Sequence, residues 1–390
     1  MDVEALRSSP VGRLEPISGV DPSTGRDWQY WAFVPTPLPS EPPLNLSAIH
    51  AATEAGMEVA RLDQAATQLP NAEILVRPIV RREAVSTSAL EGTYATFDEV
   101  LEADFIDESR QSAEQREVHN YVRATEQAMD LLHKYPISRR MLGTLQHTIV
   151  RGTPGETYDA GDIRRRQVCI GPKHRPIEES RFVPPPPGPG LEELFSDWEK
   201  WVNAQDNIPA VIKAALAHYQ FETMHPYADG NGRLGRLIAL LQLIQSNVLR
   251  LPILSIAPWL EENRDEYQDG LLRVTKSGDF NDWITFFSRA ISIQARAGVR
   301  KIALLIQFRD EMLAKLRSSG YKGAAIQIAE NLIGFPVIDV QTATKLTGKT
   351  FETTNQAVAK LVSMGYLQEI TGRPKNRLFA CPTVIFIINS

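Results

Sequence analysis

The sequence predicts a mostly α-helical protein that ends in a winged helix-turn-helix. Three observations lead to this fold class. Apolar residues recur at three- and four-residue spacing through most of the chain, which is the period of an amphipathic helix. A proline-rich stretch interrupts this period near the middle of the chain. After residue 324 the pattern changes to two short helices followed by two short strands.

Most of the chain is predicted to form a helical bundle, after a small hairpin in the first forty residues. In that first stretch, a turn cluster of Pro, Ser and Gly separates two short aromatic or aliphatic runs, which is typical of a β-hairpin. Pro or Gly lies near the ends of the helical segments, as expected where helices stop. These segments are 45–69, 71–92, 112–135, 191–204, 208–224, 233–249, 262–278 and 282–318.

The proline-rich stretch, residues 161–187, is predicted to be a flap with strand character. The prolines at 184–187 cannot continue a helix, because proline lacks the backbone N–H and clashes with the preceding turn. Two pieces of this stretch, RQVCIG and SRFV, have the composition of short strands. We therefore expect a short β-hairpin here.

The C-terminal end has the order of a winged helix-turn-helix. VQTATKLTG and TTNQAVAKLVSMG indicate two helices joined by a turn, and LQEI and RLFAC indicate a two-stranded wing. From residue 333 onward there are six Lys and Arg residues against three Asp and Glu, so the net charge is +3 where the whole chain has -5. DNA is therefore a candidate partner of this module, beside another protein or a second copy in a homodimer.

Composition argues against two classes of protein. A net charge of -5 does not suit a chain whose whole surface binds nucleic acid. No stretch is apolar over the ~18–20 residues of a membrane span, and the first residues contain no signal-peptide pattern. The two cysteines, Cys169 and Cys381, show no metal or disulfide spacing. We therefore expect a soluble cytoplasmic protein with no membrane partner.

The stretch HPYADGNGRLGR, residues 225–236, has the residue types of a phosphoryl-transfer site. Its glycines directly precede an amphipathic helix, so backbone N–H groups can converge on an anion at the helix N-terminus. Arg233 and Arg236 are three residues apart and lie on one helix face. Asp229 is an oxygen ligand suited to Mg²⁺ between phosphates, and His225 can take a proton from an attacking hydroxyl.

Each of these residues alone is more typical of a structural role. A histidine beside a proline usually packs or caps, a DGNG cluster usually forms a plain turn, and two arginines on a helix usually face solvent. Their combination in one short stretch favours the phosphoryl-transfer site. The stretch is not a P-loop, which would require GxxxxGK[ST].

The same stretch resembles the signature HPFx[D/E]GNGRxxR of the Fic family, enzymes that mostly transfer AMP from ATP to a protein hydroxyl. The resemblance extends over roughly residues 45–300 and implies a Fic-type helical bundle. One position departs from the signature, because Tyr227 stands where the family usually has Phe. The packing is preserved if the tyrosine hydroxyl finds a hydrogen-bond partner.

The resemblance implies a role for each matching residue. His225 would be the general base that activates a Ser, Thr or Tyr of a target protein, and Asp229 would hold Mg²⁺. Residues 161–187 resemble the family's flap, on which the target docks as an added strand. The enzyme itself is a second candidate target. The nucleotide would be bound by Gly230, Asn231, Gly232 and Arg233 at its phosphates, by Arg236 at the γ-phosphate, and by Asn263 and Tyr267 at the adenine.

A second short stretch, STSALEGT, suggests an inhibitory helix. Thr87, Glu91 and Gly92 match the pattern [S/T]xxxE[G/N], which marks a self-inhibitory helix in many Fic proteins. Gly92 is expected to cap the helix, so the carboxylate of Glu91 projects from its end. A bidentate pair with Arg236 would then occupy the guanidinium that the γ-phosphate needs.

The sequence thus predicts a protein adenylyltransferase that uses ATP and Mg²⁺ and is inhibited by its own Glu91. Three alternatives stay open: removal of AMP, with the same glutamate orienting a water; transfer of another group such as UMP or phosphocholine; and a nucleotide-sensing DNA-binding regulator. His225 favours an enzyme over the nucleotide-sensing regulator, because a protein that only senses a nucleotide needs no general base at this position. The predicted domains are an N-terminal segment (1–110), a catalytic core (111–300), a linker helix (301–324) and the winged-helix module (325–390).

Overall fold

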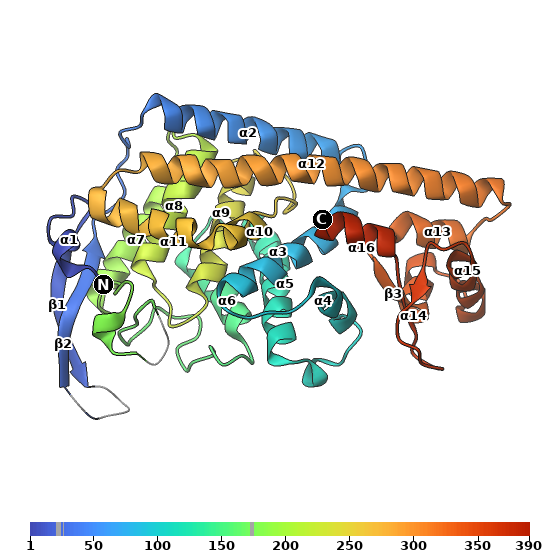
Figure 1. Cartoon of the computed structure of the whole chain (residues 1–390), viewed down its shortest axis with the longest axis horizontal. Helices are drawn as coiled ribbons and strands as arrows, with labels where there is room; N and C mark the ends of the chain where they lie inside the picture. The colour runs from blue at the N-terminus through green and yellow to red at the C-terminus, as the bar shows by residue number, and fades with distance from the viewer. Residues whose placement is uncertain (21–24, 26, 172–174) are drawn as a thin grey trace. The chain divides into compact units, whose positions relative to one another are not determined.

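The computed structural model describes residues 1–20, 25, 27–171 and 175–390 (Figure 1). The described residues form two compact units. Unit 1 takes residues 1–57, 123–248 and 259–292, and unit 2 takes residues 58–122, 249–258 and 293–390. Four helices have residues in both units: α2 (Leu46–Ala66), α5 (Ala113–Leu132), α10 (Ala257–Glu262) and α12 (Asn281–Ser318). All of the predicted helical segments are present, so the mostly α-helical fold class is confirmed.

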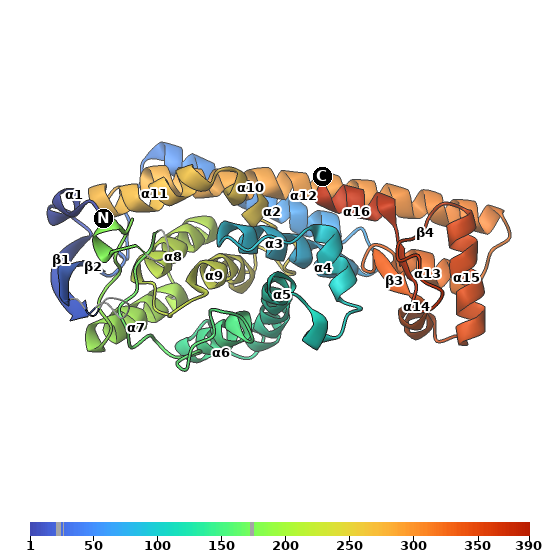
Figure 2. The same ribbon diagram turned by 60° about the horizontal axis from the view of Figure 1, so that its bottom comes forward.

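Unit 1 is built around α8 (Ala210–Met224) and α9 (Asn231–Gln245), which lie side by side (Figures 1 and 2). Two buried indoles hold α8: Trp198 Nε1 donates to the carbonyl of Ala217 at 3.0 Å, and Trp283 Nε1 donates to that of Ala215 at 2.8 Å. Almost every residue of α8 is buried, as in a central helix. The remaining helices of unit 1 are α1 (Val3–Arg7), α6 (Arg139–Val150), α7 (Pro189–Asn203) and α11 (Arg264–Ser277).

The predicted N-terminal hairpin is confirmed. Strands β1 (Gly12–Val20) and β2 (Asp27–Pro35) pair antiparallel, with Gly12 opposite Pro35 and Val20 opposite Asp27. Residues 21–24 and 26, at the turn, lie outside the described part of the chain. The hairpin is tied to α8, because Gln220 Nε2 donates to the carbonyl of Thr36, just after β2, at 2.9 Å.

The stretch predicted as a hairpin flap contains less β structure than expected. Among its described residues, a single antiparallel bridge joins Ile170 and Phe182, with N···O distances of 2.8 and 3.0 Å in the two directions. A 3₁₀ turn (Ile177–Glu179) follows the bridge on one side, and prolines, which cannot donate to a ladder, follow on the other. Residues 172–174 of the predicted flap lie outside the described residues.

In unit 2, α3 (Val76–Leu90) is buried over most of its length and is followed by α4 (Phe97–Ala103). A capping box between Thr96 and Glu99 starts α4. At the end of α3, Glu91 is the C-cap residue and Gly92 has a φ of 91°, so the predicted glycine at this helix end is confirmed. Two 3₁₀ turns, Ala72–Leu75 and Glu108–Arg110, flank this helix pair.

The C-terminal module lies in unit 2 (Figure 1). Its sheet has the antiparallel order β3-β5-β4. Side chains of Asp339 and Thr350 cap the N-termini of its second and third helices. Two helices and two strands of the module were predicted, whereas its first helix, first strand and last helix were not. In chain order the elements are α13 (Ala324–Asn331), β3 (Val337–Asp339), α14 (Val340–Thr347), α15 (Phe351–Ser363), β4 (Gln368–Glu369), β5 (Leu378–Ala380) and α16 (Pro382–Asn389). No described helix of the chain is both long and apolar enough to cross a membrane.

Candidate active site

His225 stands at the junction between α8 and the loop that leads into α9. It is the C-cap residue of α8 and adopts the left-handed conformation, with φ 47° and ψ 60°. Its backbone N–H donates to the carbonyl of Phe221 at 2.9 Å, which closes the last turn of the helix. The backbone of His225 is therefore fixed at the end of a buried helix, in the loop that leads into α9.

Arg164, at the base of the flap, holds the backbone of His225. Its Nε donates to the His225 carbonyl at 2.8 Å, and its Nη2 donates to the Pro185 carbonyl at 2.6 Å. The side chain is almost completely buried, and burial lowers the pKa of its guanidinium to about 10. The sequence did not single out Arg164, because three consecutive arginines occur there and nothing in their order shows which one is buried.

The loop between α8 and α9 is closed by Asn231. Its Oδ1 accepts from the N–H of Tyr227 at 2.9 Å, and its Nδ2 donates to the carbonyl of the same residue at 2.8 Å. The side chain of Asn231 therefore shapes the loop that leads into α9. Gly230 caps α9 in the left-handed conformation, with φ 78°. The first N–H groups of α9, from Asn231 onward, have no acceptor within the helix.

Asp229 and Arg233 form an ion pair at the start of α9. Arg233 Nη2 lies 3.1 Å from Asp229 Oδ1, and the Asp229 side chain is 45% exposed whereas that of Arg233 is buried. Two neighbours fix Asp229. Gln146 Nε2 of α6 donates to its carbonyl at 3.0 Å, and a Cβ on Gly155 would lie 2.7 Å from its Oδ2. The loop around Gly155 thus requires glycine to approach the carboxylate.

Arg236 lies one turn further along α9 and is 2% exposed. Between the two arginines, Gly235 allows α8 and α9 to approach closely, because a Cβ there would lie 2.4 Å from Glu222 Oε1. The arrangement brings together a histidine, a carboxylate, a helix N-terminus and two arginines from one short stretch. Such a group of side chains can bind the phosphates of a nucleotide and move a proton beside them.

The two residues predicted for the adenine pocket lie at the start of α11. Asn263 is the N-cap residue, and its Nδ2 donates to the carbonyl of Trp259 at 2.8 Å. The hydroxyl of Tyr267 lies 2.8 Å from Nε2 of His218, a buried residue of α8. Tyr267 is thus connected to α8, with its hydroxyl in the core of unit 1.

The predicted inhibitory residues belong to unit 2, at the end of α3. Thr87 is fully buried within that helix. Beyond it the chain turns tightly, with the N–H groups of Glu91 and Thr93 both donating to the carbonyl of Ser88 at 3.0 Å. The hydroxyl of Thr93 donates to Glu117 Oε2 at 2.8 Å, which ties this turn to α5. The pairing of Glu91 with Arg236 stays a prediction.

Comparison with known families agrees with the geometry. Residues 49–130 match the model described as Fic/DOC family N-terminal, and residues 136–243 match that of the Fic/DOC family. The chain carries a Fic/DOC core. The second match contains α8, the loop after it and α9 as far as Leu243.

Curated relatives of the Fic/DOC core are protein adenylyltransferases. The protein adenylyltransferase Fic of Culex quinquefasciatus is 29% identical over 177 residues, which cover 44% of this chain and 32% of that protein. That of Drosophila persimilis is 29% identical over 222 residues, which cover 52% of this chain and 40% of that protein. The chain thus spans only about a third to two fifths of the length of these relatives.

Solved structures show the same fold. A Fic family protein from Desulfovibrio desulfuricans aligns with a TM-score of 0.56 at 18% identity, over 87% of this chain and 98% of that one. A fragment of Fic-1 from C. elegans aligns with a TM-score of 0.50 at 23% identity, over 65% of this chain and 73% of that one. The Fic-type bundle predicted from the sequence is therefore confirmed as the fold.

The hydroxyl of Tyr227, in the Fic/DOC core, is expected to make the fold less stable than phenylalanine at the same position would. The residue is buried, burial raises its pKa, and its hydroxyl has no hydrogen-bond partner among the described residues. Tyr227→Phe is therefore expected to raise the free energy of unfolding by about 1 kcal/mol. Tyr219→Phe is the control, because the Tyr219 hydroxyl lies 3.2 Å from Thr275 Oγ1 and its loss is expected to lower stability. Urea unfolding measures both, and a less stable Tyr227→Phe chain would contradict the prediction.

His218 is expected to make the Fic/DOC core sensitive to acid. Complete burial lowers the pKa of its imidazole to about 3, from 6.5. Between those values the unfolded chain binds a proton that the folded chain does not, so stability falls as the pH falls below 6.5. The loss from pH 7 to pH 5 is expected to be about 2 kcal/mol. Urea unfolding at both pH values measures it, and an equal loss in a His218→Gln chain would rule out this origin.

Proposed function

We propose that the chain is a protein adenylyltransferase, which transfers AMP from ATP to a Ser, Thr or Tyr hydroxyl of a target protein. One observation supports this above the others. His225 is fixed at the end of α8, next to the helix start and the two arginines that suit a triphosphate. The names of the curated relatives point to the same activity.

In this mechanism the His225 imidazole takes the proton of the target hydroxyl while the hydroxyl oxygen attacks the α-phosphorus. The bond from the α-phosphorus to the bridging oxygen breaks, and pyrophosphate leaves with the electron pair. The N–H groups at the start of α9 and the guanidinium of Arg233 would stabilise the charge on the phosphates. Arg236 would bind the γ-phosphate and so fix which phosphorus faces His225.

Asp229 fits the role of a Mg²⁺ ligand. Its carboxylate is the half-exposed acid of the site, and no group of three or more His, Cys, Asp or Glu side chains that could hold a metal ion occurs among the described residues. Mg²⁺ is commonly held by one or two carboxylates, with phosphate oxygens and waters as the other ligands. When bound, the ion would neutralise phosphate charge and support departure of the pyrophosphate. Arg233 would then exchange its pair with Asp229 for a phosphate.

We also propose that α3 inhibits this activity. Glu91 stands at the C-terminal end of a buried helix that closes in a tight turn at Gly92, so its backbone has a defined position. A pair between Glu91 and Arg236 would engage the guanidinium that positions the γ-phosphate.

The other two binding regions follow from the fold. The adenine would lie near Asn263 and the ring of Tyr267. The target would dock along the described part of the flap around the Ile170–Phe182 bridge.

The test uses ATP that carries its label at either the α- or the γ-phosphate. The Glu91→Gly chain is incubated with each, with Mg²⁺ and a cell lysate, and labelled protein bands are followed, including the chain itself. Adenylyl transfer predicts label from the α-position only. Label from the γ-position would indicate phosphoryl transfer instead. No label from either, with ATP still bound, would favour AMP removal or another donor such as UTP.

For the C-terminal module we propose a winged helix that contacts DNA. The order from α13 to β5, with α15 after a capped turn, is that of such a module. Lys360 on α15 and the wing residues Arg373 and Lys375 would contact phosphates. A mobility shift with generic duplex DNA that weakens as salt rises supports this role. No shift, together with a concentration-dependent dimer, would favour self-association.

A further inference from the structure

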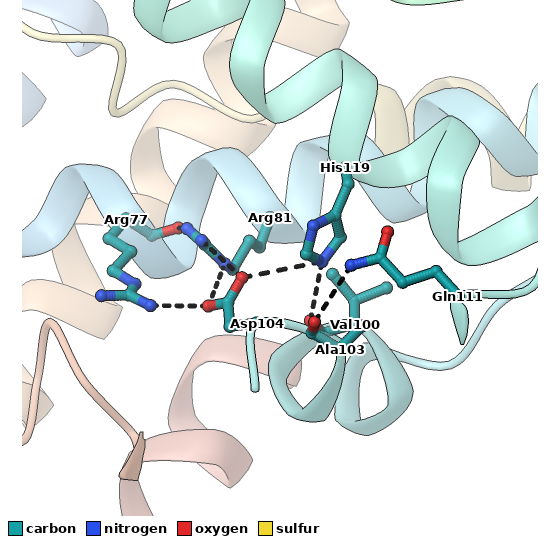
Figure 3. A network of polar contacts seen from close by, with 7 residues as sticks. All are labelled: Arg77, Arg81, Val100, Ala103, Asp104, Gln111 and His119. Atoms are coloured by element: carbon teal, nitrogen blue, oxygen red, sulfur yellow. Dashed lines mark hydrogen bonds and ion pairs between the residues drawn. The ribbon is translucent and has the colours of Figure 1, made fainter. Parts of the chain in front are cut away.

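The inhibitory helix α3 is held near its start by a buried ionic cluster (Figure 3). Arg77 and Arg81 lie one turn apart on α3, and both bind the carboxylate of Asp104, the residue that ends α4. Arg77 Nη2 lies 2.6 Å from Asp104 Oδ2, and Arg81 Nη2 lies 2.9 Å from Oδ1. Arg81 Nε adds a third contact at 3.1 Å, so this pair is bidentate.

Helix α5 supports the same carboxylate. His119 Nε2 of α5 lies 3.6 Å from Asp104 Oδ1 and 3.4 Å from the carbonyl of Val100 in α4. Nearby, Gln111 Nε2 donates to the carbonyl of Ala103 at 3.1 Å. Figure 3 shows these side chains converging on the end of α4. The acid is therefore held against α5 on one side and against α3 on the other.

The cluster is buried and charged. The side chains of Asp104 and Arg81 are 10% and 8% exposed. Burial by itself raises the pKa of the Asp104 carboxyl, but the charges and hydrogen bonds of Arg81 and Arg77 outweigh it and hold the pKa below its usual value. Removing one member of such a cluster leaves buried charge without its counterpart, which is strongly unfavourable.

A residue of the C-terminal module contacts the same place. The guanidinium of Arg77 lies 4.2 Å from the ring centroid of Phe335, which precedes β3. Next to it, a Cβ on Gly334 would lie 3.1 Å from the carbonyl of Ile74, just before α3. The start of the inhibitory helix is thus packed against the module and paired with α4.

We propose that Asp104 is a positioning residue for Glu91. Because α3 is one continuous helix, a clamp on Arg77 and Arg81 fixes the axial position of its far end, about 15 Å beyond Arg81. Loosening the clamp lets Glu91 move away from its inhibitory position while the catalytic residues stay unchanged. This inference rests on the proposed inhibitory role of Glu91.

The test is Asp104→Asn, which keeps the shape of the side chain and removes its charge. In the full chain this variant is expected to raise the rate of AMP transfer about 5-fold or more. In the Glu91→Gly background it is expected to change nothing, because the helix has no carboxylate left to position. A merely structural loss would lower the rate in both backgrounds. A rate that stays equal or falls when Glu91 is present would overturn the proposal.

Glu58→Gln is the matched control. Glu58 of α2 is a buried acid between two arginines, Arg61 at 2.5 Å and Arg296 at 3.2 Å, and neither arginine belongs to α3. This variant is expected to leave the rate of AMP transfer unchanged. Equal activation by both variants would indicate general loosening of the unit and would also overturn a specific role for Asp104.

A second measurement keeps the inference separable from the proposed function. Hydrogen exchange of the α3 amides is expected to be about tenfold faster in Asp104→Asn than in the parent chain or in Glu58→Gln. Unchanged exchange in α3 would overturn the clamp even if the enzyme is active. If exchange in Asp104→Asn is faster but Glu91→Gly shows no AMP transfer, Asp104 still holds α3 in place, and the proposed activity is refuted instead.

Discussion

A chain with both Glu91→Gly and His225→Ala is expected to transfer AMP about 10²–10⁴ times more slowly than the chain with Glu91→Gly alone. The physical reason is the loss of the group that takes the proton of the attacking hydroxyl, while the helix start and the arginines of α9 still bind the nucleotide. The measurement is the initial rate at which label from α-labelled ATP enters acid-precipitated protein.

His147→Ala in the same background is the control, because this histidine of α6 is 54% exposed and lies outside the 225–236 stretch. Nucleotide affinity is measured in parallel and is expected to stay within a few-fold of the parent. Equal labelling by the double and the single variant would refute the assignment of His225 as the base. A lost affinity would place His225 in binding instead.

Glu91→Gly alone is expected to raise the rate of AMP transfer over the unchanged chain by about 10–100-fold, which corresponds to the usual coupling energy between a regulatory contact and a site. The reason is electrostatic: without the carboxylate, the guanidinium of Arg236 is available to the γ-phosphate, so ATP binds in the productive orientation. The rate is measured at saturating ATP and Mg²⁺.

Glu91→Gln separates charge from helix geometry. It keeps the length of the side chain at the end of α3 and removes the charge, so it is expected to activate nearly as strongly as Glu91→Gly. Activation by glycine alone would mean that the altered helix end matters, and the ion pair with Arg236 would then be refuted. A chain that is equally active before and after either substitution would have no inhibitory helix.

The helices and the motif could be predicted because their information is local. The helical segments follow a period that each segment shows on its own, and all residues from His225 to Arg236 lie in one continuous stretch. The end of α3 was predictable for the same reason, since Gly92 follows Glu91 directly. A local pattern specifies the helix end but not which group in the fold the carboxylate will meet.

What the sequence did not predict depends on contacts with the backbone far along the chain. Arg164 binds a carbonyl 61 residues away and Gln146 one 83 residues away, and no spacing or composition marks a side chain for such a partner. Helix α16 was missed for a different reason. Its run of Val, Ile and Phe has the composition of a buried strand, and only its packing makes it helical.

The left-handed backbone at His225 has a consequence for evolution of this site. At that conformation a residue with a Cβ costs roughly 1–2 kcal/mol relative to glycine, so folding alone would favour glycine at the end of α8. The backbone conformation by itself therefore does not favour an imidazole there. A copy of this chain that was no longer selected for the proposed activity could relieve this backbone strain by His225→Gly. A single substitution thus separates the present sequence from one that keeps the helix end and lacks the proposed base.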